Sequence, residues 1–196
     1  MQLIFATHNP NKVAEVRAAL NGEVGILSLA DLGDRDPIAE PFFTLEENAA
    51  EKVKVVYKRY GKPAFAEDTG LEIAALEGRP GVLSARYASA EADMEANIAK
   101  VLREMKERRP REARFRTVFA LIWGDQLHFF EGEIAGHLAT EKIGQGGFGY
   151  DSVFIPAGYE ESFAQLGLEI KKKISHRTVA FQKMINFIRE KRKYMS

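Results

Sequence analysis

Four polar side chains follow the first apolar run of the chain. They bring a hydroxyl, two amides and an ammonium to the expected start of a helix, and they are Thr7, Asn9, Asn11 and Lys12. The first turn of a helix has backbone N–H groups without intrahelical partners, and the helix dipole favours negative charge there. The loop is therefore a candidate anion site, although taken alone it also fits an ordinary capped turn with a solvated lysine. The chain contains no G-x-x-x-x-G-K-[ST] phosphate loop.

Acidic residues form a second group with possible chemistry. They are Glu40 in a loop, Glu47 and Glu51 at an expected helix start, and Glu67-Asp68 after a buried strand. Mg²⁺ usually takes one or two carboxylates and completes its shell with water and phosphate oxygens. Neighbouring strand residues point to opposite faces, so only one of Glu67 and Asp68 faces a given site. The spacing of Thr44 and Glu47 is that of a capping box, which favours a capping role for Glu47.

The third group is basic and precedes the last expected helix. Lys171 to Lys173 is a charge run of the kind that usually lies on a solvated face. Ser175 can cap the following helix, so that His176 and Arg177 fall in its first turn and favour an anionic or carbonyl-rich partner. The basic stretch Arg103 to Arg116 lacks interleaved aromatic residues in its loop portion, which favours a solvated surface over RNA binding.

A glycine-rich segment, Gly144 to Gly149, matches the G-x-G-x-x-G spacing of dinucleotide-binding loops. A strand pattern follows it where a helix is required, which argues against that interpretation. The glycine-rich loop as a whole runs from Gly144 to Asp151, and a backbone loop that closes over a planar ligand explains its two aromatic residues and its acid. The chain has no G-x-S-x-G or H-E-x-x-H motif, and His8, His128 and His137 lack metal-ligand spacing. Hydrolysis by this chain would depend on a metal ion and water.

The hydrophobic pattern predicts the elements that position these groups. Buried strands are expected at Leu3 to Ala6, Val24 to Leu29 and Ala64 to Ala66, and the last would place Glu67-Asp68 at its carboxyl end, where open α/β sheets bind ligands. Asn9 and Thr44 are expected to cap helices that end at Gly22 and Gly61, and Ala30 to Phe43 is expected to be a loop.

The second half of the chain is expected to be more antiparallel. A long hairpin over Phe115 to Leu138 turns at Gly124-Asp125, a further strand covers Val153 to Ile155, and two helices are marked by Ile98, Val101, Leu102 and Met105, and by Phe181, Met184, Ile185 and Ile188. The pattern predicts a single α/β domain over residues 1–196. Its mixed central sheet is flanked by helices, and two lobes would hold the active site in the cleft between them.

The composition excludes several protein classes. The chain has 196 residues, 28 basic and 28 acidic residues, 45% hydrophobic residues and no cysteine. A chain of this length can bury a core without disulfides, and zero cysteine excludes a thiolate metal site or nucleophile. The balanced charge argues against a nucleic-acid or membrane-surface protein, and no apolar run is long enough to span a bilayer. We expect a soluble cytoplasmic protein.

Six segments together resemble the inosine triphosphate pyrophosphatase family. In chain order they are Phe5 to Lys12, Glu47-Asn48-Ala49 with Lys52, Glu67 to Leu71, Pro80 to Tyr87, Gly146 to Asp151, and Ser175-His176-Arg177. The resemblance implies Mg²⁺-dependent hydrolysis of ITP, dITP and XTP to the monophosphate and pyrophosphate, and a homodimer. Many members have Glu-Thr-Gly at Glu40-Pro41-Phe42 and Asp-Asp-Ser-Gly at Glu67 to Gly70. The second acid of the latter motif and a hydroxyl are retained.

The resemblance also implies roles for individual residues. Asp68 would be the catalytic acid, and Glu40 and Asp68 would hold Mg²⁺. The triphosphate would contact Thr7, His8, Asn9, Pro10, Asn11, Lys12 and Lys52, and Thr69 would contact the substrate. The nucleobase pocket would consist of Phe148, Gly149, Tyr150, Asp151, Lys171, His176 and Arg177. Two other readings remain open: a related pyrophosphatase for modified pyrimidines or methylated bases, and a non-catalytic nucleotide or RNA binder that uses Arg103 to Arg116.

Overall fold

The computed structural model of the protein describes residues 1–20 and 24–193. The chain falls into two compact units. Unit 1 consists of Met1–Asp68, Thr117–Gly132 and His176–Ser196, and unit 2 consists of Thr69–Arg116 and Glu133–Ser175. Each unit has a hydrophobic core of its own. None of the described helices is long and apolar enough to cross a membrane.

A mixed sheet provides the framework, as predicted. Within the described residues it has seven strands in the order β2 (Gly25–Ser28), β1 (Gln2–Phe5), β3 (Ala64–Ile73), β5 (Glu112–Trp123), β6 (Gln126–Leu138) and β7 (Phe154–Pro156), while β4 (Pro80–Gly81) pairs with β3. The pairs β1–β2 and β1–β3 are parallel, and β3–β4 and β6–β7 are antiparallel. Strands β3, β5 and β6 contribute residues to both units.

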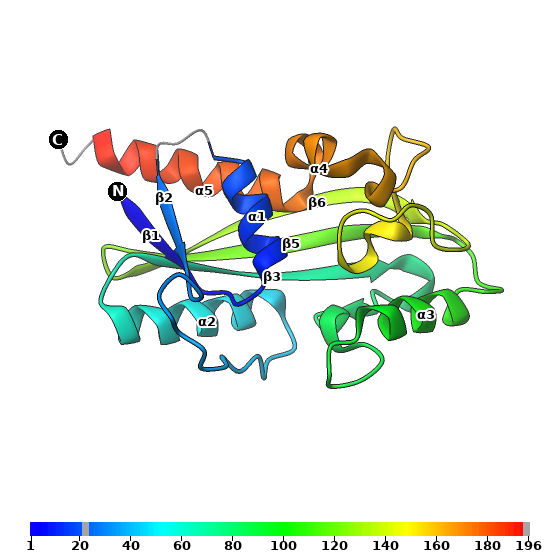
Figure 1. The fold of residues 1–196 in the computed structure, drawn as a ribbon, viewed down its shortest axis with the longest axis horizontal. Helices are drawn as coiled ribbons and strands as arrows, with labels where there is room; N and C mark the ends of the chain where they lie inside the picture. The colour runs from blue at the N-terminus through cyan, green and yellow to red at the C-terminus, as the bar shows by residue number, and fades with distance from the viewer. Residues whose placement is uncertain (21–23, 194–196) are drawn as a thin grey trace. The chain divides into compact units, whose positions relative to one another are not determined.

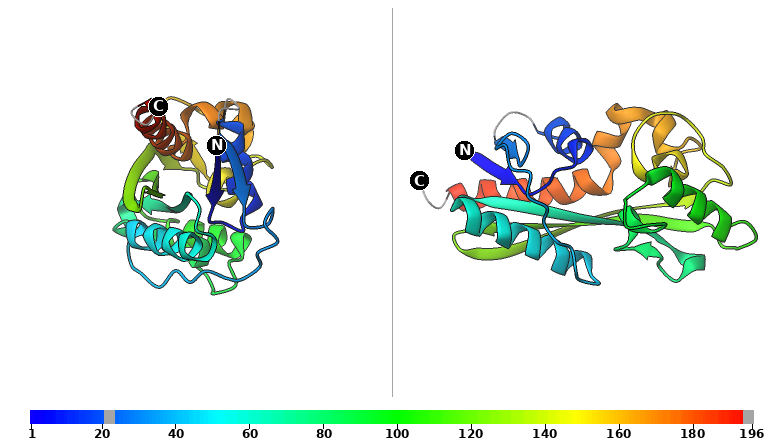
Figure 2. Two further views of the ribbon diagram at one scale, coloured as in Figure 1. Left: turned by 90° about the vertical axis from the view of Figure 1, so that its left-hand side faces the viewer. Right: turned by 60° about the horizontal axis from the view of Figure 1, so that its bottom comes forward.

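In unit 1, helices cover both faces of the strands. Helices α1 (Pro10–Ala18) and α5 (His176–Lys193) lie on one face and α2 (Leu45–Tyr60) lies on the other (Figures 1 and 2). Each face buries apolar side chains: Val16 and Phe181 pack on the first, and Ala49 and Val53 on the second. This double cover explains why the first strand reads as a continuous apolar run.

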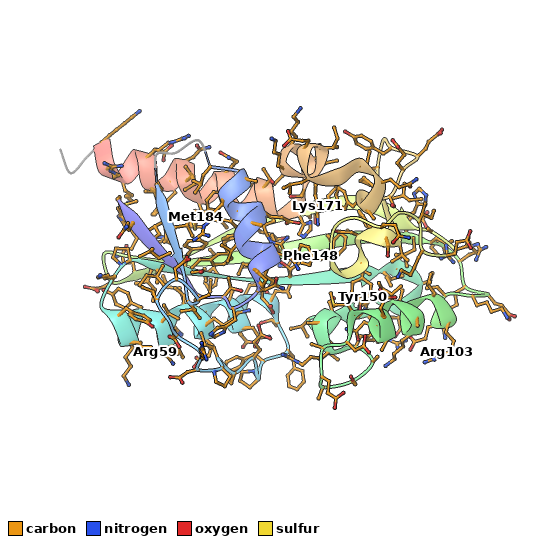
Figure 3. All side chains as sticks on the ribbon, in the orientation of Figure 1. Arg59, Arg103, Phe148, Tyr150, Lys171 and Met184 are labelled. Atoms are coloured by element: carbon orange, nitrogen blue, oxygen red, sulfur yellow. The ribbon has the colours of Figure 1, made fainter. Side chains whose placement is uncertain are left out.

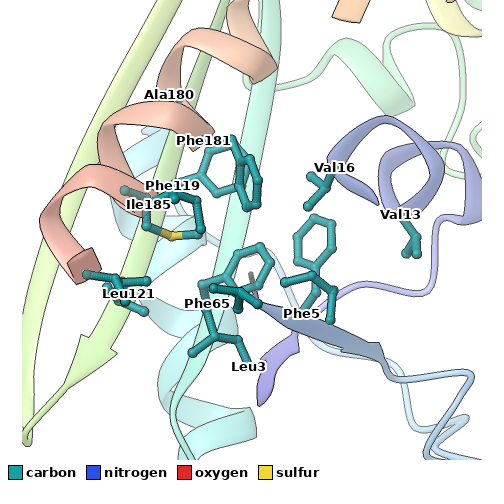
Figure 4. Close-up of a cluster of buried hydrophobic side chains, with 14 residues drawn as sticks. Leu3, Phe5, Val13, Val16, Phe65, Phe119, Leu121, Ala180, Phe181 and Ile185 are labelled. Carbon is teal, nitrogen blue, oxygen red and sulfur yellow. The ribbon is translucent and has the colours of Figure 1, made fainter. Parts of the chain in front are cut away.

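Aromatic rings fill the core between the strands and α5. The rings of Phe5 and Phe65 stack with centroids 4.5 Å apart, and Phe119 and Phe181 join them (Figure 4). Trp123, the only tryptophan of the chain, is partly buried against this cluster. The stacked rings hold the end of β1 against the first residues of β3, and the polar segments identified above follow Phe5 and Phe65 closely in the chain.

Unit 2 contains α3 (Met94–Glu104), α4 (Phe163–Ile174) and the 3₁₀ turns η1 (Ala74–Leu76), η2 (Ser84–Arg86) and η3 (Gly149–Ser152). Its core is built on Phe115, Phe154 and Phe163, whose rings contact one another. Helix α4 was not predicted from sequence. Gly167 adopts φ 71° inside it and breaks the helical geometry, which disrupts the periodicity that a sequence reading relies on.

The predicted caps and turn are confirmed. The Asn9 side chain accepts from the backbone of Asn11 and Lys12, and the Thr44 side chain accepts from Glu47. Gly124 and Asp125 both have positive φ, as the tight hairpin turn requires. Gly61 ends α2 in the left-handed conformation, whereas Gly22 lies outside the described residues.

Two predicted positions differ from the structure. Glu67 and Asp68 lie in the middle of the ten-residue strand β3 rather than at its end, because β3 continues into an antiparallel pair with β4. It is the parallel neighbour β1 that stops first, with Phe5 opposite Phe65. Ser175 directly precedes α5 in an extended conformation, at the predicted cap position, and is also the C-cap of α4, where its backbone N–H donates to the Lys171 carbonyl. His176 and Arg177 do begin the last helix, as predicted.

Candidate active site

Asn9 organises the loop between β1 and α1. Its Oδ1 accepts from the backbone N–H of Asn11 at 2.9 Å and of Lys12 at 3.4 Å, while its own N–H donates to Thr7 Oγ1 at 3.2 Å. Pro10 occupies the first helical position, and His8 Nε2 lies 3.2 Å from the Asp34 carbonyl oxygen. The backbone N–H groups of Asn11 and Lys12, which were expected to face an anion, thus donate to the Asn9 side chain. Lys12 is the cation that this loop presents.

Lys52, on α2, lies between two carboxylates. Its Nζ is 2.5 Å from Glu40 Oε1 and 3.1 Å from Asp68 Oδ1, and its side chain is 8% exposed. Burial lowers the pKa of Lys52, but the charges of Asp68 and Glu40 outweigh it and raise the pKa overall. Burial raises the pKa of Asp68, and the neighbouring Glu40 adds to the rise, against the opposing effect of Lys52 and Lys12.

Asn48 fixes the loop that carries Glu40. Its Oδ1 accepts from the Phe42 N–H at 3.0 Å, and its Nδ2 lies 3.1 Å from the Phe42 carbonyl and 3.4 Å from Asp68 Oδ2. The amide therefore links Asp68 to the segment of Glu40. No role was assigned to Asn48 from sequence, although a polar amide on the apolar face of a helix could have drawn attention to it; its side chain is 1% exposed.

Glu67 was a candidate acid in the sequence, but no role was assigned to it there. Its fully buried carboxylate lies 2.7 Å from Lys12 Nζ and 3.0 Å from Arg177 Nε, and Thr117 Oγ1 donates to it at 2.8 Å. Arg177 Nη1 also donates to Glu15. Burial raises the pKa of Glu67, but Arg177 and Lys12 outweigh it and hold the pKa well below its ordinary value.

Unit 1 therefore unites residues from four distant segments. Lys12 and Arg177 both pair with Glu67, and Glu40 and Asp68 both pair with Lys52. The two acids of β3 have separate sets of partners, as alternating faces of a strand require. Burial lowers the pKa of Arg177, but the charges of Glu67 and Glu15 outweigh it and raise the pKa overall.

Unit 2 holds a buried ion pair of its own. Lys171 Nζ lies 2.5 Å from Asp151 Oδ2 and 4.6 Å from the ring centroid of Phe148. Lys171 and Phe148 are labelled in Figure 3. Asp151 Oδ2 also accepts from the Phe148 N–H at 2.8 Å. Gly147 has φ 73°, and a Cβ there would lie 2.3 Å from Asp151 Oδ2. The glycine allows the loop to wrap around the carboxylate.

Other predicted substrate contacts occupy supporting positions. Tyr150 is 3% exposed in the core of unit 2, where its hydroxyl donates to the Ser84 carbonyl at 2.9 Å, and burial raises the pKa of its phenol. Gly149 adopts φ 62°, Thr69 is partly exposed on β3, and His176 is 2% exposed at the start of α5. Direct substrate contact by these residues stays a prediction, as does the position of the site in a cleft.

The donor atoms of Glu40 and Asp68 suit a hard divalent cation. Both carboxylates already share one cation, the Lys52 ammonium, and the charge of Glu40 contributes to the raised pKa of Asp68. A cluster of three or more acidic or histidine side chains that could hold a metal is absent from residues 1–20 and 24–193. Two carboxylates fit Mg²⁺, which completes its shell with water and phosphate oxygens.

Comparison with known proteins shows which family the chain resembles. The model of the Ham1 family matches residues 3–187. A dITP/XTP pyrophosphatase of Porphyromonas gingivalis is 50% identical over 188 residues, covering 95% of this chain and 97% of the relative. The dITP/XTP pyrophosphatase of Bacillus subtilis is 44% identical over 187 residues, covering 93% of this chain and 94% of the relative.

Solved structures agree with these sequence matches. The Ham1 protein of Staphylococcus aureus has a TM-score of 0.87 at 32% identity and covers 97% of this chain and 100% of its own. A HAM1 protein from Coxiella burnetii has a TM-score of 0.87 at 33% identity, with 97% and 99% covered. The mixed sheet flanked by helices is the fold of these proteins.

Proposed function

Because this chain belongs to the Ham1 family, we propose that it hydrolyses non-standard purine nucleoside triphosphates, namely ITP, dITP and XTP, to the monophosphate and pyrophosphate. The observation that carries the proposal is the pairing of Lys12 and Lys52 with three acids of unit 1. Such an enzyme removes deaminated purines from the nucleotide pool.

The polyphosphate is assigned to the cations of unit 1. Lys12 is supplied by the first turn of α1, which Asn9 caps, and Lys52 is supplied by α2. Phosphoryl transfer needs charge neutralisation and placement of the attacking water more than covalent help from the protein. The two ammonium groups neutralise the phosphates, and Thr7, His8, Asn9, Pro10 and Asn11 shape the turn that receives them.

We assign Mg²⁺ to Glu40 and Asp68. When bound, the ion would supply charge neutralisation for the phosphates and acidify a bound water. Asp68 is the catalytic residue of the proposal, because its carboxylate lies beside Lys52 and is held by Asn48. A raised pKa suits a carboxylate that accepts a proton from water.

We assign recognition of the nucleobase to hydrogen-bond donors and to the face of an aromatic ring. Inosine and xanthine carry a 6-oxo group, which accepts hydrogen bonds where the 6-amino group of adenine donates them. The donors of Arg177 and the start of α5 at His176 would favour the oxo group, since an amino group facing donors leaves buried polar atoms unpaired. In unit 2, Phe148 offers a ring face, and Asp151 and Lys171 hold the loop that carries it, together with Gly149 and Tyr150.

The proposal extends to the setting of the enzyme. A nucleotide-pool enzyme acts on free small molecules in the cytoplasm, without nucleic-acid or membrane partners, and the equal numbers of basic and acidic residues support this. We also propose a homodimer, on the resemblance to the family alone. Light scattering of the purified protein measures its mass in solution directly.

Product analysis with ITP tests the reaction. We expect inosine monophosphate and pyrophosphate, with activity that requires Mg²⁺; release of phosphate and inosine diphosphate would contradict cleavage between the α- and β-phosphates. A panel with XTP, dITP, ATP, GTP, UTP and 5-methyl-UTP tests the substrate class. Faster cleavage of UTP or 5-methyl-UTP than of ITP and XTP would assign the enzyme to pyrimidine substrates.

A further inference from the structure

Glu67 links two cations that the proposed function assigns to different ends of the substrate. Lys12, assigned to the polyphosphate, lies 2.7 Å from Glu67 Oε1, and Arg177, assigned to the base, lies 3.0 Å from Glu67 Oε2. The two cations come from the first and last helices of the chain. A single carboxylate thus contacts both.

Lys12, Glu67, Arg177 and Glu15 form an ion cluster that is almost entirely buried. The side chains of Glu67, Arg177 and Glu15 are 0%, 3% and 9% exposed, while that of Lys12 is 19% exposed. Two positive charges are matched by two negative ones. In surroundings that screen charges poorly, the position of one member affects the others more strongly than in water.

Binding of a polyphosphate changes the balance of this cluster. The phosphates compete with Glu67 for the Lys12 ammonium, which is the most exposed member. As Lys12 turns to the phosphates, Glu67 loses one of its two cations and attracts Arg177 more strongly, while Thr117 stays bonded to Glu67 and Glu15 to Arg177. The position of the guanidinium then depends on whether Lys12 is engaged.

We propose that Glu67 is a positioning residue that couples Lys12 to Arg177, so that the Lys12 charge affects selectivity for the base as well as binding of the phosphates. This inference rests on the proposed function. Lys52 provides the contrast, because it is a buried lysine of the same unit that pairs with Asp68 and Glu40.

The test compares kcat/KM for ITP and ATP in matched variants. We expect Lys12→Met to reduce the ITP-to-ATP ratio by about three- to tenfold, the range of coupling between charges in contact. Lys52→Met should lower activity on both nucleotides and leave their ratio unchanged, and Lys12→Arg should restore the ratio. In a Glu67→Gln background, Lys12→Met should have no further effect on the ratio.

Each outcome decides the inference. An unchanged ratio in Lys12→Met, or equal changes in Lys12→Met and Lys52→Met, overturns it, and so does an undiminished effect of Lys12→Met in the Glu67→Gln background. If Glu67→Gln does not fold, as circular dichroism will show, the three lysine variants still decide. A wild-type enzyme without preference for ITP over ATP would instead refute the proposed function.

Discussion

A Cβ added to Gly132 would lie 2.2 Å from the carbonyl oxygen of His176 and 2.6 Å from the backbone nitrogen of Ala180. Strand β6 therefore touches the first turn of α5, the turn that carries Arg177. Glycine is required at this point by the closeness of the helix backbone. The position of Arg177 thus depends on a residue of another element that contacts no substrate in the proposed site.

We expect Gly132→Ala to lower the free energy of unfolding by about 1–3 kcal/mol, as overpacking does, and to reduce the ITP-to-ATP ratio because the start of α5 shifts. Chemical denaturation and steady-state kinetics measure the two effects. Gly25→Ala is the matched control, because its nearest neighbour is the flexible Gln2 side chain at 3.3 Å. Equal stability of the two variants would show that the contact relaxes without cost.

Asp68→Asn should lower turnover of ITP by at least about a hundredfold, a typical loss for one electrostatic interaction in catalysis. The amide keeps the shape of the side chain but removes the charge beside Lys52. Asp36→Asn, at a side chain 80% exposed, is the control and should leave turnover unchanged. Near wild-type turnover in Asp68→Asn would remove this carboxylate from the mechanism.

Asp151→Asn should destabilise the protein by about 3–5 kcal/mol, because it leaves Lys171 buried without its counter-charge. Thermal melting measures the loss. Glu95→Gln breaks the exposed pair with Lys142, where side chains are 72% and 44% exposed, and should cost at most about 1 kcal/mol. Similar melting temperatures for the two variants would contradict the expectation that the buried Asp151–Lys171 pair contributes more to stability than the exposed pair.

Ser152 carries a buried hydroxyl oxygen without a hydrogen-bond partner in the described structure. Since an unpaired buried polar group costs about 1–3 kcal/mol, Ser152→Ala should leave stability unchanged or increase it. Ser162→Ala should have the opposite effect, because the Ser162 hydroxyl donates to the Ile143 carbonyl at 2.6 Å. Denaturant titrations of both variants give the comparison, and destabilisation in both would mean that Ser152 has a partner.

Tyr87 should make the protein sensitive to alkali. Burial and the hydrogen bond to Glu104 raise the pKa of Tyr87 from 10.0 to about 12. The folded state holds this proton more tightly than the unfolded chain, so its contribution is present below pH 10 and is lost as the pH rises towards 12. Between these pH values, wild-type stability should fall more steeply than that of Tyr87→Phe. Parallel curves would contradict the raised pKa.

Local signals in the sequence predicted most elements because they depend on neighbouring residues alone. Asn9 and Thr44 mark helix starts through hydrogen bonds to their own helices, and the Gly124-Asp125 turn requires positive φ at both positions. Helix α4 was not predicted, because Gly167 interrupts its helical geometry. The extension of β3 beyond Asp68 was not predicted, because it depends on pairing with β4, a short strand with little hydrophobic pattern of its own.

The site was predicted less completely than the fold. Lys12, Lys52, Asp68 and Arg177 were identified by residue type and by resemblance, and the structure gives each of them a partner. The partners Glu67, Glu15 and Asn48 could not be assigned from sequence, because their roles depend on contacts between segments far apart in the chain. A buried acid is recognisable only once the cations around it are known.

The single tryptophan offers a way to observe the two units separately. Trp123 packs against the aromatic core of unit 1, and the chain contains no second indole. Its fluorescence emission will therefore report on loss of that core, whereas far-ultraviolet circular dichroism averages over the helices of both units. Unfolding curves that coincide by the two methods would indicate one cooperative transition, and curves that separate would show which part of the chain melts first.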